Sequence, residues 1–599
     1  MQALRRASVA AALCLLALGV PLPAAPTAAE DLVSAYLERW AEFYPSQATA
    51  AGRTDFDRQL ENIDEASVAR WLRFGAAIAD GGRQLAASPA LSRDDRIDLD
   101  VLLNAIARER LTLRTRAVWQ RDPLFWTDLA ANAAIYLLLR DDQPRPERIA
   151  ALEARAAALP RLLAQAERAL GPTPRDRLAP ELVRPAAQQA KSLVRLYRSG
   201  LGEFAAAAPE AQRKSLAAAG DAAAAALERF GAFLDRLAGE ARGSARLGAD
   251  YAETFRLYLR TGEKPADLLP RFERDLAALR REVAAYGRQV WPQLRPAEAL
   301  PADDTALIRR LFALVEAQHD TAVAAYVRFW QELPPQLEAF ARERGVVTLP
   351  GPRTLKILPA PNFLLGQAFG GVFPAGPYRP DGQTLLLLPV PGAETDAAGR
   401  AKFFRAFNRP FSRMIAAHEA LPGHYVQLKT AAHQAHEVRA IFPDQVYAEG
   451  WGTFAERLML EAGWGGPLEW LAHYKKQLEN CTRAIVDIRV QTTDVSRAEI
   501  ARFVREEGLQ DGQLGENLWF RTLTSAPQLV TYHVGYGEIR ALYRDARARA
   551  GDRFDLRAFN DWLLSRGAIP LHYYREEMAA SAATPRAGAG APPPPNETP

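Results

Sequence analysis

The chain has 599 residues, with 75 basic and 71 acidic side chains, a formal net charge of +4 and 48% hydrophobic residues. Charges of both signs are interspersed without a run of Lys or Arg, which argues against nucleic acid as a partner. Two cysteines exclude a disulfide framework, and no segment after the N-terminal region has the 18 or more apolar residues of a membrane helix, so stable membrane insertion is not expected.

Residues 1–29 are predicted to be a signal peptide. Two arginines precede an apolar run from Val9 to Val20, which is followed by small residues up to Ala29. The run is too short for a permanent membrane anchor. Cys14 follows Leu13, whereas a lipoprotein cleavage site has a small residue there, so lipidation is disfavoured. We therefore expect an exported, periplasmic protein.

Residues 30–343 are predicted to be a helical N-terminal part. They are rich in Ala, Leu, Arg and Glu, and apolar residues recur every three or four positions, as between Leu307 and Val315. The composition changes between Gly345 and Pro391, where short apolar runs separated by Pro and Gly predict strands. These runs are Val346–Leu349, Thr354–Leu358 and Thr384–Val390.

Helices are expected to resume near Ala401 and to continue to about Met578. Residues 344–580 would then form a catalytic part that combines a small sheet with the helices of the candidate site. Residues 581–599 are rich in Ala, Gly and Pro and are expected to be disordered. The predicted fold class is mainly α, with a small β-sheet near the active site.

The segment from His418 to His424 reads His-Glu-Ala-Leu-Pro-Gly-His and is the strongest candidate for a catalytic site. In helical zinc peptidases, two histidines four residues apart share one helix face. A spacing of six leaves the two side chains about 120° apart on an ideal helix. Pro422 removes a helical hydrogen bond and Gly423 tolerates unusual backbone geometry. The motif is therefore either a kinked zinc site or a coincidence at a helix end.

A catalytic zinc ion usually takes three protein ligands, and two His with one Glu are a common set. The best source of a third ligand is the predicted helix from Val446 to Glu456. Glu449 is favoured as the ligand. Glu456, seven residues later on the same face, is assigned either a place behind the ligands or a solvated position.

Glu419 directly follows His418 and is turned about 100° from it on a helix. This direction suits contact with a water molecule on the metal, so Glu419 is the predicted general base and the proton donor to the leaving amine. The alternative is that His418 and Glu419 are a surface pair near a helix end.

Three rings near the C-terminal end are candidates for the group that stabilises the oxyanion: Tyr532 first, then His533 and Tyr536. The alternative is that they are buried rings with satisfied polar tips. Asp487, between Arg483 and Arg489, is either a group that orients a ligand histidine or part of an internal salt-bridge cluster.

With these motifs, the chain resembles the bacterial proteins of the domain of unknown function 885, predicted zinc peptidases with a His-Glu-x-x-Pro-Gly-His signature. The resemblance begins near Tyr44-Pro45 and spans most of the chain. It rests on His418–His424 with the following Tyr-Val-Gln, on Glu449-Gly450-Trp451, on Arg483–Asp487, and on Tyr532 with Gly535. It implies a mostly helical fold similar to the large helical zinc peptidases, with zinc bound by His418, His424 and Glu449. The chain departs from the family after Asp487, where Gln491 takes the place of a usual histidine.

The sequence thus predicts an exported zinc peptidase that cleaves short peptides with a metal-activated water and Glu419 as general base. By analogy with similar folds we expect exopeptidase action. A second hypothesis is a zinc amidase on cell-wall or other non-protein amides, and a third is a periplasmic binding protein without catalysis. An edge strand at Thr384–Val390 is expected to hold an extended peptide. No oligomeric state is predicted.

Overall fold

The computed structural model of the protein describes residues 27–141, 143–360, 371–392 and 394–580. The predicted disordered tail and nearly all of the predicted signal peptide lie outside the described residues. Residues 27–29, the end of that signal peptide, belong to the first helical turn, which Thr27 caps. Among the described residues, no helix combines the length and apolar composition needed to span a bilayer. The predicted class is confirmed, since the described chain is mostly helical with one small sheet.

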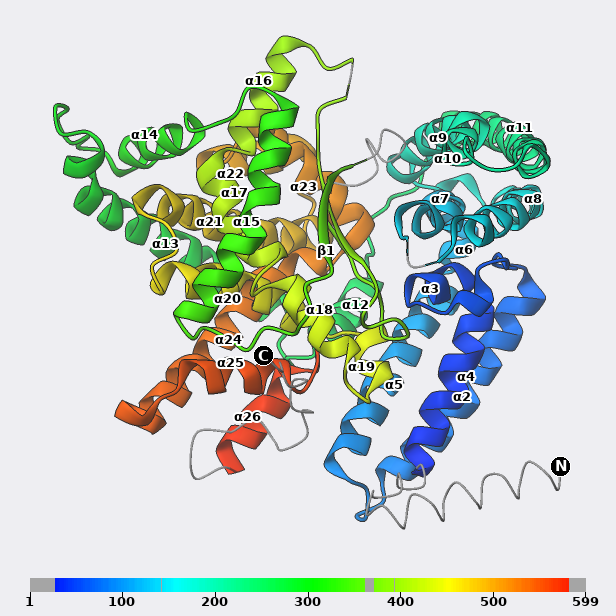
Figure 1. Cartoon of the computed structure of the whole chain (residues 1–599), viewed down its shortest axis with the longest axis horizontal. Helices are drawn as coiled ribbons and strands as arrows, with labels where there is room; N and C mark the ends of the chain where they lie inside the picture. Colours follow the sequence, from blue (N-terminus) through cyan, green and yellow to red (C-terminus); the bar gives the residue numbers. More distant parts are fainter. Residues whose placement is uncertain (1–26, 142, 361–370, 393, 581–599) are drawn as a thin grey trace, which may run out of the picture.

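The first helices form a column on one side of the molecule, coloured blue and cyan (Figure 1). Alanine-rich faces pack there; α11, for example, lies against both α8 and α9. The helices are α2 (Ala28–Phe43), α3 (Pro45–Ala50), α4 (Glu65–Ala86), α5 (Arg93–Arg110), α6 (Val118–Arg121), α7 (Pro123–Leu139), α8 (Arg145–Leu170), α9 (Pro180–Arg195), α10 (Leu201–Phe204) and α11 (Glu210–Glu240). The next helix, α12 (Asp250–Leu259), lies near the middle of the molecule and contacts α5 (Figure 1).

The remaining helices form the larger body, coloured green to red (Figure 1). Its long helix α21 packs against α13, α14, α17 and α24. The helices are α13 (Pro265–Leu294), α14 (Asp304–Glu316), α15 (Val323–Glu343), α16 (Ala397–Ala406), α17 (Arg409–Glu419), α18 (His424–Ala432), α19 (Glu437–Ile441), α20 (Gln445–Glu461), α21 (Pro467–Thr492), α22 (Arg497–Glu506), α23 (Gly512–Ser525), α24 (Gln528–Ala550), α25 (Leu556–Leu564) and α26 (Leu571–Ala580).

The sheet has three strands in the order β1 (Leu355–Pro359), β3 (Thr384–Leu388), β2 (Gly371–Phe373). β3 pairs in parallel with β1 and antiparallel with β2, and all five of its residues are buried. The prediction that Thr384–Val390 offers an open edge to a peptide is therefore wrong, because backbone pairing already occupies both sides of β3. The predicted strand at Val346–Leu349 is also wrong; Val346 and Val347 are buried in an irregular segment.

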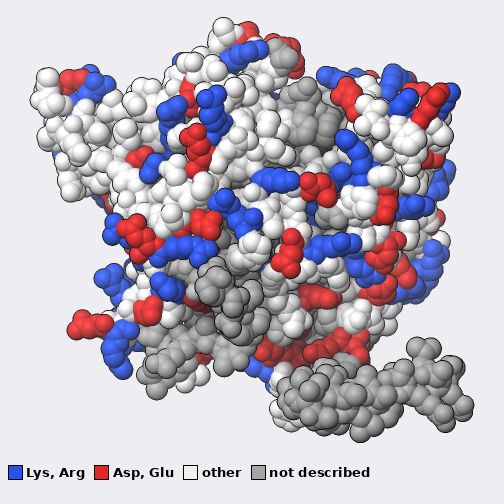
Figure 2. Space-filling view, viewed as in Figure 1, with Lys and Arg blue, Asp and Glu red and all other residues white. Residues whose placement is uncertain are grey.

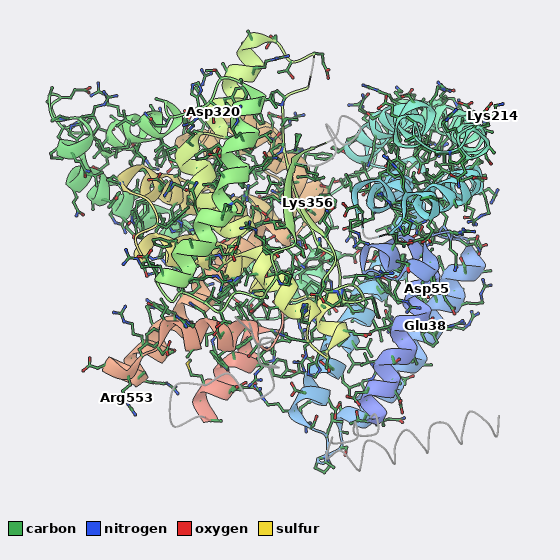
Figure 3. All side chains as sticks on the ribbon, viewed as in Figure 1. Glu38, Asp55, Lys214, Asp320, Lys356 and Arg553 are labelled. Carbon is green, nitrogen blue, oxygen red and sulfur yellow. The ribbon has the colours of Figure 1, made fainter. Side chains whose placement is uncertain are left out.

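The sheet connects the two groups of helices. Lys356 on β1 lies between them in Figure 3, and its Nζ atom is 3.0 Å from a carboxylate oxygen of Asp141, just after α7. The buried Arg140 guanidinium donates to the carbonyl oxygens of Ala375, near β2, and of Thr49 in α3. One continuous core cluster extends from Tyr36 to Met578. On the visible surface both signs of charge are intermixed (Figure 2).

Candidate metal centre

A break between two helices brings the motif histidines together. His418 lies in the last turn of α17 and His424 is the first residue of α18. Their ring centroids are 4.7 Å apart and the ring planes are nearly perpendicular. The N–H of Gly423 donates to the carbonyl oxygen of Ala417, and a Cβ atom at Gly423 would lie 1.8 Å from the carbonyl oxygen of His418. The predicted kink is confirmed as a helix break, and its geometry requires glycine.

Capping side chains fix where the helices of the site begin. The Asn408 side chain accepts from the N–H of Phe411 at the start of α17. Asp444 accepts from the N–H of Tyr447 at the start of α20. Such caps satisfy backbone N–H groups that have no partner within the helix and so stabilise the starts of the two helices that carry His418 and Glu449.

Glu449 on α20 completes a three-ligand cluster. Its Oε2 atom is 3.7 Å from Nε2 of His418 and 3.5 Å from Nε2 of His424. Ligand atoms around a tetrahedral zinc ion lie about 3.4 Å apart, given metal–ligand distances of about 2.1 Å. One atom from each of these side chains lies within 4.8 Å of the others. Two imidazole nitrogens and one carboxylate oxygen are a donor set that zinc accepts, so these residues fit the ion.

The other nitrogen of each imidazole is held by an acceptor. Nδ1 of His418 is 2.9 Å from Oε1 of the fully buried Glu456, whose Oε2 is 2.9 Å from Nδ1 of His473. Nδ1 of His424 is 3.2 Å from Oε1 of Gln427. Such contacts fix the ring orientation and leave Nε2 for a metal. Of the two alternatives for Glu456, the structure therefore has the buried place beside His418 and not the solvated one.

Glycines on α20 allow this helix to pack closely against the neighbouring elements of the site. A Cβ atom at Gly452 would lie 2.8 Å from the His418 imidazole. On the other side of Trp451, a Cβ atom at Gly450 would lie 2.5 Å from the backbone of Gly535 on α24. Trp451 itself donates to the carbonyl oxygen of Pro422, which ties α20 to the break between the motif helices.

The cluster opens into a cavity of about 1340 Å³. His418, His424, Glu449, Glu419 and Tyr532 all line it, and so do residues of β2 and β3. Trp40 and Gln47 of the N-terminal helices form part of the same wall. The small sheet therefore lies near the site, as predicted, and the volume is large enough for a short peptide.

The electrostatics of the cluster favour positive charge between the ligand groups. Although burial lowers it, the pKa of His418 is raised to about 10 by Glu449 and Glu456. Burial raises the pKa of Glu449, but the two imidazoles more than offset this and hold it well below its usual range. Carboxylates that stay ionised beside imidazoles are suited to a bound cation.

Tyr532 keeps its proton beside this cluster. Burial, followed by the negative charge of Glu449, raises the pKa of Tyr532 to about 12. The Gln528 amide donates to the Tyr532 hydroxyl over 3.0 Å and lies 3.3 Å from Oε1 of Glu449. A protonated phenol on the cavity wall is able to donate a hydrogen bond to a substrate oxygen.

The structure does not bring the other two ring candidates to the cluster. His533 is turned toward α13, with its Nε2 atom 3.1 Å from Asp275. His533 and Tyr536 both line a second, separate cavity of about 410 Å³, and neither lines the first. Successive residues of a helix are rotated by about 100°, so the His533 side chain points in a different direction from that of Tyr532. Tyr536 lies about one helical turn after His533. Stabilisation of an oxyanion by His533 or Tyr536 therefore has no geometric support.

Asp487 does not orient a ligand histidine. It is fully buried and accepts a hydrogen bond of 2.8 Å from the Tyr251 hydroxyl on α12. Gln491, one turn later, accepts from the N–H of Leu247 and donates to the carbonyl oxygen of Thr522. Both side chains tie α21 to neighbouring segments, and neither lines the cavity of the cluster.

Sequence reasoning missed three residues that support the site. Gln427 was not assigned a role, although its position three residues after His424 on one helix is typical of a contact between the two side chains. Gln528 also has a local signal, since Tyr532 lies four residues later on the same helix, but its contact with Glu449 is distant in the sequence. His473 has no local signal, because its partner Glu456 lies on another helix.

Comparisons with known proteins agree with this fold. A structure from Shewanella oneidensis, described as a "putative lipoprotein of unknown function", is 23% identical with a TM-score of 0.75, and the match covers 93% of this chain and all of the other. A "putative lipoprotein" from Colwellia psychrerythraea is 17% identical with a TM-score of 0.73, covering 92% and 98% of the two chains. No curated protein matches the sequence. One protein family matches residues 45–578, which are most of the chain. The protein therefore belongs to the family described as bacterial protein of unknown function (DUF885).

Proposed function

We propose that the protein is an exported zinc-dependent peptidase that hydrolyses short peptides. The observation that carries the proposal is the convergence of His418, His424 and Glu449 on one point of a peptide-sized cavity, with the Nδ1 atom of each histidine held from behind. Zinc in such a site supplies Lewis-acid polarisation of a carbonyl group and of water.

The side chains around the ligands have roles that follow from their positions. Glu419 is the last residue of α17, next to His418, and it lines the cavity. It takes a proton from the attacking water and passes it to the leaving amine. Tyr532 donates its hydroxyl proton in a hydrogen bond to the carbonyl oxygen of the scissile bond.

The replacement Glu419→Gln tests this proposal. It preserves shape and removes the base, so we expect one zinc ion per chain in both proteins and a loss of peptide hydrolysis of about 10²–10⁴-fold in the variant. Zinc is measured by atomic emission, and cleavage is measured by mass spectrometry on a mixed peptide library. A variant that still cleaves at the wild-type rate, or a wild-type protein that binds no zinc, contradicts the mechanism.

Export is part of the proposal. Residues 1–29 have the composition of a signal peptide, and each of the two similar structures is described as a "putative lipoprotein". Those descriptions favour a lipid on Cys14, whereas Leu13 before it disfavours one. Mass spectrometry of the N-terminus after expression in a bacterial host distinguishes cleavage before a lipidated Cys14 from cleavage near Glu30. A protein that keeps an intact N-terminus in the cytoplasm contradicts export.

A further inference from the structure

A group of basic side chains faces the same cavity beside the cluster. Lys476, Glu479 and Arg483 follow each other on α21 at spacings of three and four, so they share one helix face. Arg521 extends from α23. All four side chains line the cavity.

This group has more positive than negative charge. Glu479 is the carboxylate among the three cations, and it contacts both Arg483 and Lys476, the latter over 3.5 Å. The negative charge of Glu456 also attracts Lys476, but both carboxylate oxygens of Glu456 already contact histidine nitrogens. Lys476 and Arg483 are only 8% and 9% exposed, and among the described residues Nε of Arg483 has no hydrogen-bond partner. Cations crowded in a region of low dielectric constant repel one another, so an anion would be stabilised there.

The basic group lies next to the proposed metal ligands. Gln528 accepts a hydrogen bond of 2.7 Å from Arg521 and lies 3.3 Å from Oε1 of Glu449. One amide group therefore separates the Arg521 guanidinium from a ligand carboxylate. Arg483 stacks over the Tyr532 ring at 5.2 Å from its centroid. An anion held by these residues lies about one or two extended residues from the proposed reaction centre.

We propose that Lys476, Arg483 and Arg521 form a subsite that binds a carboxylate of the substrate. The inference rests on the proposed peptidase function and names its substrate class: short peptides with a carboxylate close to the scissile bond. Arginine matches a carboxylate with two parallel hydrogen bonds, and lysine adds a point charge. The carboxylate is either the free C-terminus, which makes the enzyme an exopeptidase for short chains, or an acidic side chain.

Binding experiments test the subsite without turnover. The probes are acetyl-Ala-Ala as free acid, its C-terminal amide, and acetyl-Ala-Asp-amide, each titrated by calorimetry into full-length Glu419→Gln protein with and without zinc. We expect the free acid to bind at least 10-fold more tightly than the amide. Binding of acetyl-Ala-Asp-amide as tight as that of the free acid shows that the subsite also accepts acidic side chains, and weak binding assigns it to the free C-terminus.

Variants locate the carboxylate. Arg521→Gln and Lys476→Met are expected to weaken binding of the free acid about 10-fold or more and to leave the amide unchanged, while Arg521→Lys retains part of the preference. The matched control is Arg489→Gln on the same helix, because Arg489 is paired with Glu273 and does not line the cavity. In cleavage assays with otherwise wild-type enzyme, the effect should appear in KM more than in kcat.

The outcomes separate this subsite from the peptidase proposal. Equal binding of the free acid and the amide by the Glu419→Gln protein that carries no further substitution overturns the subsite, even if the wild-type enzyme hydrolyses peptides. A preference for the free acid that requires Arg521, together with no peptide cleavage by the zinc-loaded wild type, retains a carboxylate site and rejects the peptidase. A preference for the free acid that Arg521→Gln and Lys476→Met leave intact also overturns the assignment.

Discussion

The imidazole of His418 lies directly against the backbone of Gly452, at a distance that leaves no room for a methyl group. The contact therefore limits where the ring of one proposed metal ligand can lie. Gly452 lies on the same helix as Glu449, so the spacing between two ligands depends on this close approach.

Replacement of Gly452 by Ala is expected to lower zinc affinity. The new Cβ atom would lie 2.8 Å from the His418 ring, so the ring must shift from its position near Glu449. We expect at least a 10-fold weaker zinc affinity by chelator competition. The control is Gly537→Ala, in a helix where an added Cβ meets nothing within 4 Å, and it should bind zinc normally. Equal affinity in both variants would show that the contact does not position the ring.

Replacement of Glu456 by Gln is expected to reduce zinc affinity about 10–100-fold, a typical effect for groups behind metal ligands. The carboxylate accepts from His418 and His473 at once, whereas an amide has one accepting oxygen. Zinc competition and circular dichroism separate the effect on the metal from a loss of fold. Glu461→Gln on the same helix is the control, because Glu461 is a partly exposed partner of Arg457. An unchanged zinc affinity for folded Glu456→Gln would contradict the role of Glu456.

Replacement of Tyr532 by Phe is expected to lower kcat about 10–100-fold with little change in zinc content. The variant removes a hydroxyl that lines the cavity and would donate to the substrate carbonyl oxygen. Tyr536→Phe, on the same helix but lining the second cavity, should keep wild-type kcat. If the Tyr536 variant is the impaired one, the assignment of the two rings is reversed.

Asp487 should make stability depend on pH. Burial raises its pKa to about 7, against the hydrogen bond from Tyr251, while an unfolded Asp has a pKa of about 3.9. Between about pH 4 and 7 the native state holds a proton that the unfolded chain has lost, so the free energy of unfolding falls as pH rises. In Asp487→Asn, we expect the decrease in the free energy of unfolding over this pH range to be smaller by about 2–4 kcal/mol.

Urea unfolding at pH 4.5 and pH 7.5 measures this pH difference in the wild type and in Asp487→Asn. Asp494→Asn, at an exposed position after the same helix, corrects for the general effect of the substitution. A pH dependence in Asp487→Asn equal to that of Asp494→Asn would mean that Asp487 titrates normally.

Local patterns predicted the features that depend on nearby residues. The helices and the break at Pro422-Gly423 follow from spacing within one or two turns, and so does the shared face of Glu449 and Glu456 on α20. The continuous leucines of β3 also indicated a strand covered on both faces, which is typical of a central position. The prediction of an open edge disregarded that signal.

The rest depends on contacts between distant segments. Which face of α24 points to the ligands is set by its crossing with α20 at Gly535 and Gly450, so the sequence around Tyr532 did not separate it from His533. The partner of Asp487 is Tyr251, 236 positions earlier in the chain, and no local pattern predicts that pair.

The contribution of Trp40 and Gln47 to the cavity wall has a consequence for dissecting the protein. A fragment starting at residue 344 would contain all three proposed ligands, Glu419 and the basic group. It would nevertheless lack one side of the chamber, so water would reach the ligands freely. Water exclusion strengthens electrostatic interactions in an active site, and such a fragment would lose that advantage. The proposed hydrolysis is therefore expected to require the N-terminal helices as part of the cavity wall, although they supply none of the proposed chemical groups.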